Sequence, residues 1–405
     1  MKKHHLSSII DSDKKQKMTE VFMDLDYFIT TLRKIISINT ISSDNISEDM
    51  SNLELLNFLE EEGRKLGATA QRRTVPGTKD KENLLLRFGP DTDGGLLLSG
   101  HTDTVPCDPS QWRSDPFTLK SSGEYLYGLG VIDMKGYFAH IFSAVRDNID
   151  ISSLAKPLYV LATADEETTM AGAQAFIRET AVKPDGLVIG EPTSLVPVFQ
   201  HKGFMAYEIA VQGKSGHSSD PDAGISALLI MVKIIEGIDT WAKNLRLRFP
   251  DESFSVPYPT VNIGSIQGGD SPNRICSRCS ILLDMRPLAS TPSEFMEKEL
   301  IREVMKAAGE YHNLVTVRSL YPGMDPFATP EDSRLIRKLS ELSGEKAIAV
   351  NYCTEASFLK DLHCEVAVMG AGDIADAHQP DEKLPVSEIS RQHWILTELI
   401  RDYCQ

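Results

Sequence analysis

Four short runs of apolar residues in this sequence are each followed by acidic residues or a histidine. The runs cover residues 96–98, 158–162, 186–190 and 366–370, and the polar residues after them are His101, Asp103, Asp165, Glu166, Glu167, Glu191 and His378. Uninterrupted apolar runs of this length are typical of strands in a parallel sheet that helices cover on both faces. Ligands of such sheets bind outside the carboxyl ends of the strands. We therefore expect these polar side chains to converge on one site, although they span most of the chain.

A glycine-containing segment at residues 127–136, YGLGVIDMKG, supplies one more acidic residue, Asp133. Its glycines permit tight turns and close approach of the backbone to a ligand. A predicted helix follows at residues 136–146, so Asp133 could equally be a helix N-cap, a position that aspartate favours. The three consecutive acids at 165–167 could likewise form a solvated surface run. Directly after a buried strand, however, they would repel one another unless a cation compensates their charge.

The sequence predicts an α/β fold in two parts. Residues 23–196 and 322–405 contain the four apolar runs and are predicted to form a catalytic domain with a mostly parallel sheet and helices on both faces. Between them, residues 197–321 alternate apolar and polar side chains, as in half-exposed antiparallel strands. Their order of strand, helix, two strands, helix and strand predicts an inserted α+β (ferredoxin-like) lid or dimerisation domain. Its helix at 225–235 is apolar on most of its circumference, which indicates a subunit interface. Apolar periodicity predicts helices at 25–36, 51–66, 136–146, 224–237 and 292–308.

Composition and charge exclude several classes of function. The chain has 405 residues, of which 41% are apolar and 25% charged, as expected of a globular protein. Its formal net charge of −16 disfavours nucleic acid and anionic membranes as partners, and no stretch approaches the roughly 18 apolar residues of a membrane span. A cytoplasmic location is predicted because the N-terminus lacks the apolar segment of a secretory signal. Residues 1–22 are polar and are predicted to be a disordered extension, with Met18 and Met23 as alternative start positions.

Two histidines and three or four carboxylates are suitable ligands for divalent first-row metals, zinc above all. One carboxylate can hold two such ions about 3.5–4 Å apart, as in two-metal hydrolases. Ions held in this way lower the pKa of a water molecule and polarise a substrate carbonyl, while a further carboxylate passes a proton to the leaving amine. Spacing leaves open which of Glu166 and Glu167 binds metal, because adjacent residues in an extended segment point in opposite directions.

Six strings, taken in their order along the chain, resemble the M20 family of metallopeptidases and deacylases. They are SGHTDTVP, YGLGVIDMKG, TADEET, GEPT, GKSGHSSDP and AHQPDE. The resemblance covers roughly residues 24–405 and implies a hydrolase with two Zn²⁺ or Co²⁺ ions per subunit. The metal ligands that it implies are His101 and Glu191 for one ion, Glu167 and His378 for the other, and Asp133 as the bridge between them.

The resemblance also implies roles for residues that do not bind metal. Glu166 resembles the general acid/base, and Asp103 resembles the carboxylate that orients His101. His217, in the GKSGHSSDP string, resembles a histidine that reaches the site of a neighbouring subunit and stabilises an oxyanion. A homodimer is therefore implied, with catalysis shared between its subunits.

Further strings resemble family members that deacetylate N2-acetyl-L-ornithine in arginine biosynthesis. They are VPYPT at 256–260, NRIC at 273–276, DMRPL at 284–288 and NYCTE at 351–355. Arg286 and Asn273 resemble contacts to a substrate carboxylate, for which the guanidinium fork is well suited. Thr354 and Glu355 are candidates for the substrate's amino end, so the implied substrate is a small N-acyl amino acid.

Other functions remain open at this point. Sister activities of the same family are succinyl-diaminopimelate desuccinylase, aminoacylase and dipeptidase, and the first of these would need a pocket for a second charged group. A non-catalytic binding protein on the same scaffold would be expected to lack a metal ligand or the base. All of these positions are intact in this sequence, which favours an enzyme.

Overall fold

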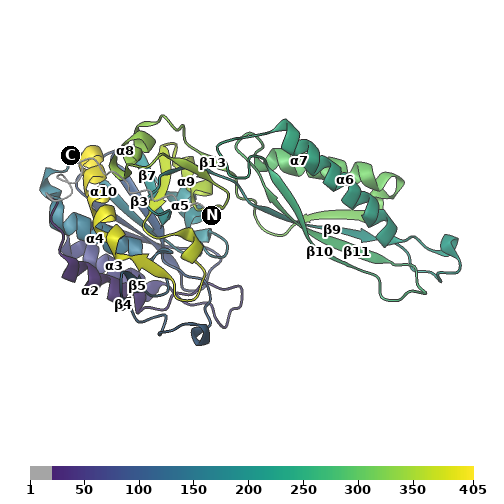
Figure 1. Ribbon diagram of the computed structural model, residues 1–405, viewed down its shortest axis with the longest axis horizontal. Coiled ribbons are helices and arrows are strands. Elements are labelled where there is room, and N and C mark those ends of the chain that lie inside the picture. Colours follow the sequence, from purple (N-terminus) through teal and green to yellow (C-terminus); the bar gives the residue numbers. More distant parts are fainter. Residues whose placement is uncertain (1–20) are drawn as a thin grey trace, which may run out of the picture. The chain divides into compact units, whose positions relative to one another are not determined.

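The computed structural model describes residues 21–405, which fold into two compact units (Figure 1). The first unit contains the described residues up to Phe199, together with Thr329–Ala347 and Leu359–Gln405. The second contains Gln200–Ala328 and Ile348–Phe358. Most of the predicted extension at residues 1–22 lies outside the described residues.

A large mixed sheet forms the centre of the first unit. Its strands are β1 (Thr69–Thr74), β2 (Glu82–Phe88), β3 (Leu96–His101), β6 (Leu158–Thr163), β7 (Gly186–Pro192) and β15 (Glu365–Gly370), in the spatial order β1-β2-β6-β3-β7-β15. The inner strands β6, β3, β7 and β15 are parallel, whereas β1 and β2 pair antiparallel at one edge. The chain passes from the first unit to the second along β8 (Val198–His201), which pairs with β15, β13 (Phe327–Ala328) and β14 (Ile348–Val350).

The inner strands lie between helices, as their apolar sequences predict. Every residue of β3, β6 and β7 is buried. The helices of the first unit are α2 (Leu25–Ile36), α3 (Leu53–Lys65), α4 (Gly136–Asn148), α5 (Ala171–Glu179), α8 (Arg334–Ser343) and α10 (Val386–Cys404). Most of the short helix α9 (Ala356–Leu359) belongs to the second unit. On β2, Leu86 packs against Gly63 of α3, while Asn83 donates a hydrogen bond to Gly172 of α5. Because residues an odd number of positions apart on a strand point to opposite faces, these contacts place helices on both faces of the sheet. The predicted fold class is confirmed.

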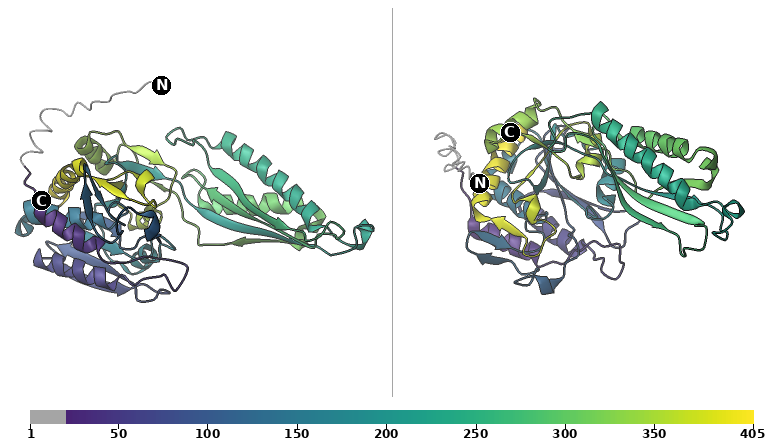
Figure 2. Two further views of the ribbon diagram at one scale, coloured as in Figure 1. Left: turned by 60° about the horizontal axis from the view of Figure 1, so that its bottom comes forward. Right: turned by 45° about the vertical axis from the view of Figure 1, so that its right-hand side comes forward.

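Two smaller sheets complete the structure. In the first unit, β4 (Lys120–Ser122), β5 (Tyr125–Tyr127) and β16 (Lys383–Pro385) form an antiparallel sheet in the order β16-β5-β4. In the second unit, β9 (Met205–Gln212), β10 (Thr260–Gly268), β11 (Arg278–Arg286) and β12 (Val315–Ser319) form an antiparallel sheet in the order β10-β11-β9-β12. Helices α6 (Ala227–Arg248) and α7 (Ser293–Ala308) cover one face of it (Figure 2). This is the ferredoxin-like arrangement that the element order predicts.

The alternating sequence of β9 explains how its sheet is covered on one face. Tyr207, Ile209 and Val211 are buried against α6 and α7, whereas Glu208 on the other face pairs with Arg318. Among the described residues, no helix is long and apolar enough to cross a membrane. All six cysteines are free thiols.

His140 of α4 is a buried histidine in the core of the first unit. Its ring packs against Phe28 with the ring centroids 4.6 Å apart, and neither ring nitrogen has a hydrogen-bond partner among residues 21–405. Burial, reinforced by the nearby charge of His393, lowers the pKa of His140 to about 3. Between pH 6.5 and pH 3 the unfolded chain therefore binds a proton at this residue that the folded chain does not bind. Its contribution to stability is full above pH 6.5 and is lost progressively as the pH falls through this window.

We expect His140→Phe to reduce the acid sensitivity of the fold. Relative to wild type, the variant should gain about 1.4 kcal/mol of unfolding free energy for each pH unit below 6.5. Urea unfolding at a series of pH values measures this difference, and His312→Gln, at an exposed histidine, is the control. Parallel stability curves for wild type and His140→Phe would contradict the assignment.

Candidate active site

The predicted metal ligands of the first unit lie at the carboxyl ends of neighbouring parallel strands. His101 is the last residue of β3, and Glu191 lies near the end of the adjacent strand β7. Glu167 follows β6, and His378 follows β15. Parallel strands that lie side by side end at one edge of the sheet, so residues separated by up to 277 positions in the sequence come together there.

Asp133 lies in the loop before α4 and faces both histidines. The N-cap of that helix is Lys135, so the alternative interpretation of Asp133 as the cap is wrong. Its Oδ1 lies 3.1 Å from Nε2 of His101, and its Oδ2 lies 3.1 Å from Nε2 of His378. Each oxygen of one carboxylate therefore serves a different imidazole, the geometry expected of a carboxylate shared by two cations.

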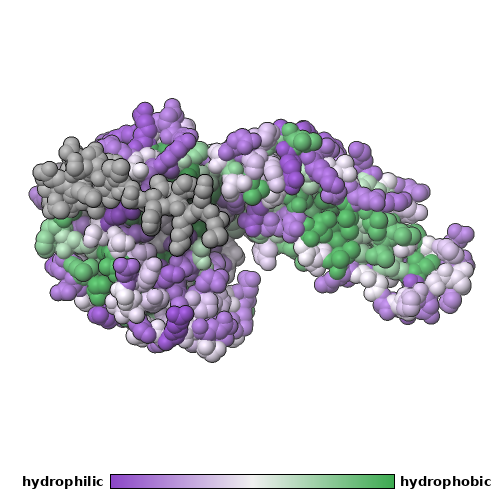
Figure 3. All heavy atoms as spheres, in the orientation of Figure 1, coloured by the Kyte–Doolittle hydropathy of each residue, from purple (hydrophilic) through white to green (hydrophobic). Residues whose placement is uncertain are grey.

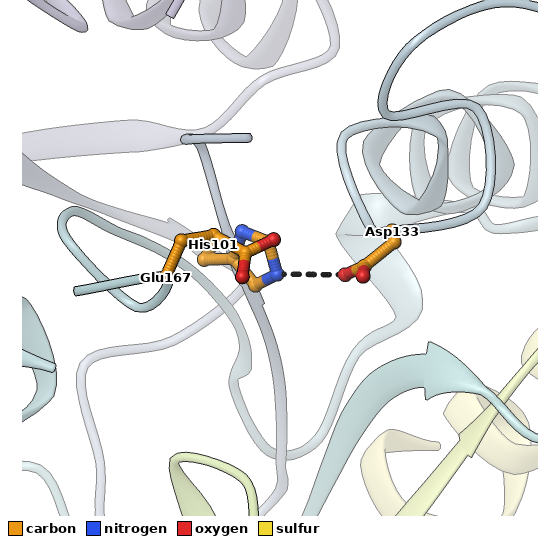
Figure 4. A group of neighbouring side chains, drawn as sticks. All are labelled: His101, Asp133 and Glu167. Atoms are coloured by element: carbon orange, nitrogen blue, oxygen red, sulfur yellow. Dashed lines mark hydrogen bonds and ion pairs between the residues drawn. The ribbon is translucent and has the colours of Figure 1, made fainter. Parts of the chain in front are cut away.

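The other two carboxylates each lie close to one of the imidazoles. Glu191 Oε1 is 3.9 Å from Nε2 of His101, and Glu167 Oε2 is 3.1 Å from Nε2 of His378. His101, Asp133 and Glu167 each offer one possible ligand atom, and these three atoms lie within 4.8 Å of one another (Figure 4). Each imidazole therefore has one oxygen of Asp133 and one glutamate carboxylate beside it.

The electrostatics of this cluster favour a bound cation. Burial lowers the pKa of His101, but its hydrogen bond to Asp133 and the charges of Glu191, Asp103 and Glu166 outweigh burial and hold that pKa well above its usual value. Hydrogen bonds to Asp133 and Glu167 raise the pKa of His378 to about 10. The carboxylate charges that stabilise protonated imidazoles so strongly would equally attract a divalent cation. Imidazole nitrogens with carboxylate oxygens are donors that such ions accept, so the residues fit the metal that the sequence predicts.

Asp103 orients the site through both its backbone and its side chain. Its carbonyl oxygen accepts a hydrogen bond from Nδ1 of His101 at 3.0 Å, and its carboxylate oxygen Oδ1 lies 3.6 Å from the same nitrogen. The carboxylate accepts the backbone N–H groups of Glu166 at 3.2 Å and Glu167 at 3.1 Å. Asp103, of which 2% is exposed, therefore connects the imidazole of one ligand to the loop that carries another.

The three consecutive acids after β6 have three different environments. Asp165 is buried in an ion pair with Lys81. Glu167 faces His378, and burial raises the pKa of its carboxyl, with a further contribution from Asp133. Glu166 is half-buried beside Glu167. The sequence predicts that a cation compensates this run, and Lys81 is such a cation for Asp165.

Glu382, the last residue of the AHQPDE string, is a buried carboxylate to which the sequence assigned no role. It accepts the backbone N–H groups of Gly130, Ile132 and Asp133 at 2.8, 2.8 and 3.1 Å. Burial and the neighbouring charge of Asp133 raise the pKa of Glu382 to about 8. Glu382 therefore fixes the loop that presents Asp133. No local pattern indicates this contact, because about 250 residues separate the partners.

We expect Glu382→Gln to weaken metal binding by about 10–100-fold, the usual effect of removing a group that orients a ligand. The amide can accept only through one oxygen, so at least one N–H of the Asp133 loop loses its partner. Isothermal titration with Zn²⁺ measures the affinity. Asp381→Asn is the matched control, since Asp381 pairs with Arg113 instead. Equal affinities for Glu382→Gln and wild type would show that this loop needs no such support.

In the second unit, the loops that carry His217 and Asn273 lie together. Ser218 donates its backbone N–H to the carbonyl of Asn273 at 3.1 Å, and His217 forms a β-bridge with Arg274. His217 is exposed, and its Nδ1 accepts the backbone N–H of Ser219 at 3.3 Å. Nδ1 also lies 2.7 Å from Ser219 Oγ, so both polar groups of Ser219 contact one ring nitrogen of His217.

The remaining predicted substrate contacts lie elsewhere in the second unit. Arg286 donates from Nε and Nη2 to the carboxylate of Asp284 at 3.1 and 3.0 Å, and its guanidinium lies 4.6 Å from the ring centroid of Phe204. Thr354 is buried, and its backbone N–H donates to Nε2 of His201 at 3.3 Å. Glu355, next to Thr354, is also fully buried.

A cavity of about 450 Å³ in the first unit lies beside strands β1, β2 and β6 and helix α5. Leu85 and Leu161 contribute to its floor, and Phe176 of α5 and Arg73 of β1 contribute to its walls. None of the predicted site residues lines it. We therefore assign the chemistry to the carboxyl ends of the strands and not to this cavity.

Comparison with known proteins agrees with the fold. Residues 97–402 match a model described as peptidase family M20/M25/M40. The chain is 44% identical over 381 residues to the acetylornithine deacetylase of Edwardsiella ictaluri (strain 93-146), which covers 94% of this chain and 99% of that protein. With this fold and this cluster of ligands, the chain is a metal-dependent hydrolase. It belongs to peptidase family M20/M25/M40, which confirms the resemblance in the sequence.

Two solved structures share the fold. Aminopeptidase PepT from Bacillus cereus has a TM-score of 0.72 and 17% identity, and the match covers 94% of this chain and 99% of that one. The YXEP protein of Bacillus subtilis, described as a dinuclear metal binding peptidase from the M20 family, has a TM-score of 0.62 and 15% identity, with 96% and 99% covered. At these identities the two structures support the fold alone.

Proposed function

We propose that the protein is a two-metal amidohydrolase that hydrolyses N2-acetyl-L-ornithine to L-ornithine and acetate in arginine biosynthesis. The position of Asp133 carries the two-metal part of this proposal, because its two oxygens face the imidazoles of His101 and His378. The substrate is proposed from the relative that is 44% identical over 94% of this chain and is named acetylornithine deacetylase.

The proposed ligand sets follow the contacts of the cluster. His101 and Glu191 would hold one ion, His378 and Glu167 would hold the other, and Asp133 would contact both. Zn²⁺ and Co²⁺ accept such mixed nitrogen and oxygen ligands. Bound there, the ions would lower the pKa of a water molecule and polarise the acyl carbonyl of the substrate.

Glu166 is proposed as the general acid/base. It lies next to Glu167. Burial lowers the pKa of His101 and the hydrogen bond to Asp133 raises it, and the charge of Glu166 makes a smaller contribution that also raises it. From this position its carboxylate can take a proton from the water that attacks the acetyl carbon and then donate it to the leaving nitrogen. Asp103 holds the backbone of Glu166 in place.

His217 is proposed to stabilise the oxyanion in the site of a partner subunit. Its Nδ1 contacts Ser219, so Nε2–H is the donor that this proposal assigns to the oxyanion. A homodimer would then be required for catalysis, with residues 197–321 serving as lid and dimerisation domain. A cytoplasmic location is part of the proposal and is consistent with the six free cysteines.

An apolar surface on α6 supports the proposed dimer. Leu228, Leu229 and Val232 are 40%, 66% and 45% exposed, and hydrophobic side chains gather on this part of the second unit in Figure 3. Contiguous exposed apolar side chains are typical of interaction sites.

We expect Leu229→Glu to convert a dimer into a monomer and to lower kcat, since His217 would no longer reach a partner. Sedimentation velocity and activity measure the two effects, and Lys243→Ala on the same helix is the control. A monomeric wild type with full activity would contradict this proposal.

The proposed substrate contacts use charge and hydrogen bonding. The edge of Arg286 that is not occupied by Asp284 can bind the carboxylate of the substrate, and Asn273 can donate from its amide. Thr354 and Glu355 are proposed for the amino end, where a carboxylate would attract the ammonium group of ornithine.

A substrate panel tests the proposal. The metal-loaded protein is assayed with N-acetylornithine, N-succinyl-diaminopimelate, N-acetylmethionine and a dipeptide. We expect kcat/KM for N-acetylornithine to exceed the others by about tenfold or more. A preference for another substrate would retain the metal chemistry and refute the proposed substrate. A chelator should abolish the activity, and Zn²⁺ or Co²⁺ should restore it. If the protein binds metal but hydrolyses no substrate of the panel, a non-catalytic protein would be favoured instead.

A further inference from the structure

Lys81, which directly precedes β2, is a buried cation beside the metal-binding loop of the first unit. Only 2% of the residue is exposed. Its Nζ donates to Ser42 Oγ at 2.8 Å, to Asp49 Oδ1 at 2.6 Å and to Asp165 Oδ1. Ser42 Oγ donates in turn to the same oxygen of Asp165 at 2.9 Å. Three side chains from distant parts of the sequence therefore meet at the ammonium group.

Asp165 is the residue from which the ligand loop departs. Its backbone has a φ of 61°, the left-handed region that is costly for an aspartate, and its carbonyl accepts the N–H of Thr169 at 3.1 Å. The next two residues are Glu166 and Glu167, whose backbone N–H groups donate to Asp103. Asp165 therefore anchors one end of the segment that presents the proposed base and one proposed ligand.

The charge of Asp165 would be unfavourable at this position without Lys81. Asp103, Glu166 and Glu167 are acidic neighbours, and 7% of Asp165 is exposed. A buried carboxylate that loses its cation carries a large desolvation cost, and it moves towards water or another cation to reduce that cost.

We propose that Lys81 is a positioning residue of the active site. Its ammonium group binds Asp165 and so keeps this carboxylate out of the metal centre. In doing so it fixes the backbone from which Glu166 and Glu167 project. The kinetic part of this inference rests on the proposed function, whereas the structural part concerns only the ligand loop and bound metal.

The test compares Lys81→Met with the double variant Lys81→Met/Asp165→Asn. Methionine is an unbranched side chain one atom shorter than lysine and carries no charge, and asparagine can still accept from Ser42. We expect Lys81→Met to alter the visible absorption bands of the Co²⁺-loaded protein and to lower kcat by about 10–100-fold, with KM within about threefold of wild type. The double variant should recover the wild-type spectrum and come within about tenfold of the wild-type kcat, because the unpaired charge is gone.

Lys65→Met is the matched control. Lys65 forms exposed ion pairs with Glu61 and Glu62 on α3, and its loss should change neither the spectrum nor kcat. A wild-type spectrum and kcat in Lys81→Met would overturn the proposal. A double variant no better than Lys81→Met would also overturn it, because a purely structural role predicts that the two losses add.

A milder pair of variants decides the matter if Lys81→Met does not fold. Ser42→Ala removes only the hydroxyl that joins Lys81 to Asp165, whereas Ser43→Ala removes a hydroxyl that accepts from Asn45. Ser42→Ala should shift the Co²⁺ spectrum and lower kcat by at least about threefold, consistent with losing a hydrogen bond to charged groups. Identical behaviour of the two variants would overturn the proposal. If wild type cleaves no substrate of the panel, the proposed function fails, and the Co²⁺ spectra still test the role of Lys81.

Discussion

Glu166→Ala is expected to lower kcat for N-acetylornithine by about 10²–10⁴-fold and to leave the metal content unchanged. Loss of a general acid/base has an effect of this size, because Glu166 is the group proposed to deliver the proton to the leaving nitrogen. The metal should remain because the proposed ligands on both sides of Asp133 are retained. Steady-state kinetics and elemental analysis of the purified variant measure the two quantities.

Glu167→Ala is the informative comparison, since it replaces the adjacent carboxylate. Glu167 Oε2 lies 3.1 Å from Nε2 of His378, so this variant should lose one ion together with its activity. If Glu166→Ala turned over substrate at a near-normal rate, or if it were the variant that lost metal, the roles of the two glutamates would have to be exchanged or abandoned.

Asp133→Asn is expected to weaken metal binding by more than about 100-fold and to abolish measurable deacetylation. The effect should exceed the 10–100-fold that is typical of groups outside the ligand shell, because this residue is proposed to bind both ions. Its amide presents one oxygen and one nitrogen where two oxygens face His101 and His378. Titration with Zn²⁺ should show both sites weakened, and not one alone.

The number of affected sites separates this prediction from its alternatives. Asp150→Asn changes an exposed aspartate that caps a short helix, and it should keep wild-type affinity. His101→Ala should affect mainly one site. If Asp133→Asn also weakened only one site, Asp133 would be an ordinary ligand and not a bridge.

Most helices and strands could be predicted from local sequence. The helix expected at 25–36 is α2 (Leu25–Ile36), because its apolar periodicity coincides with an N-cap at Asp24. The helix expected at 224–237 instead continues to Arg248 as α6. Gly237 looks like a terminus in the sequence, but a Cβ there would lie 2.9 Å from Ala307 of α7. The glycine permits close helix packing, a tertiary requirement that no local pattern reveals.

The candidate site divides in the same way. The metal ligands could be predicted because each follows a buried parallel strand, and such strands end at one edge of the sheet. Lys81 and Glu382 could not be predicted, because each contacts a segment more than 80 residues away in the sequence. Neither residue follows an apolar run, and before the chain folds each resembles an ordinary surface charge.

The sequence by itself determined the buried strands, their order along the chain and the kinds of side chain that follow them. These follow from periodicity, which depends on the covalent geometry of neighbouring residues. Only the tertiary structure decided which carboxylate has which partner. It pairs Asp165 with Lys81, directs the Asp103 carboxylate to two backbone N–H groups, and places Asp133 between two imidazoles. The physical reason is that the free energy of a buried charge depends on the groups that folding brings next to it, and these groups come from distant parts of the chain.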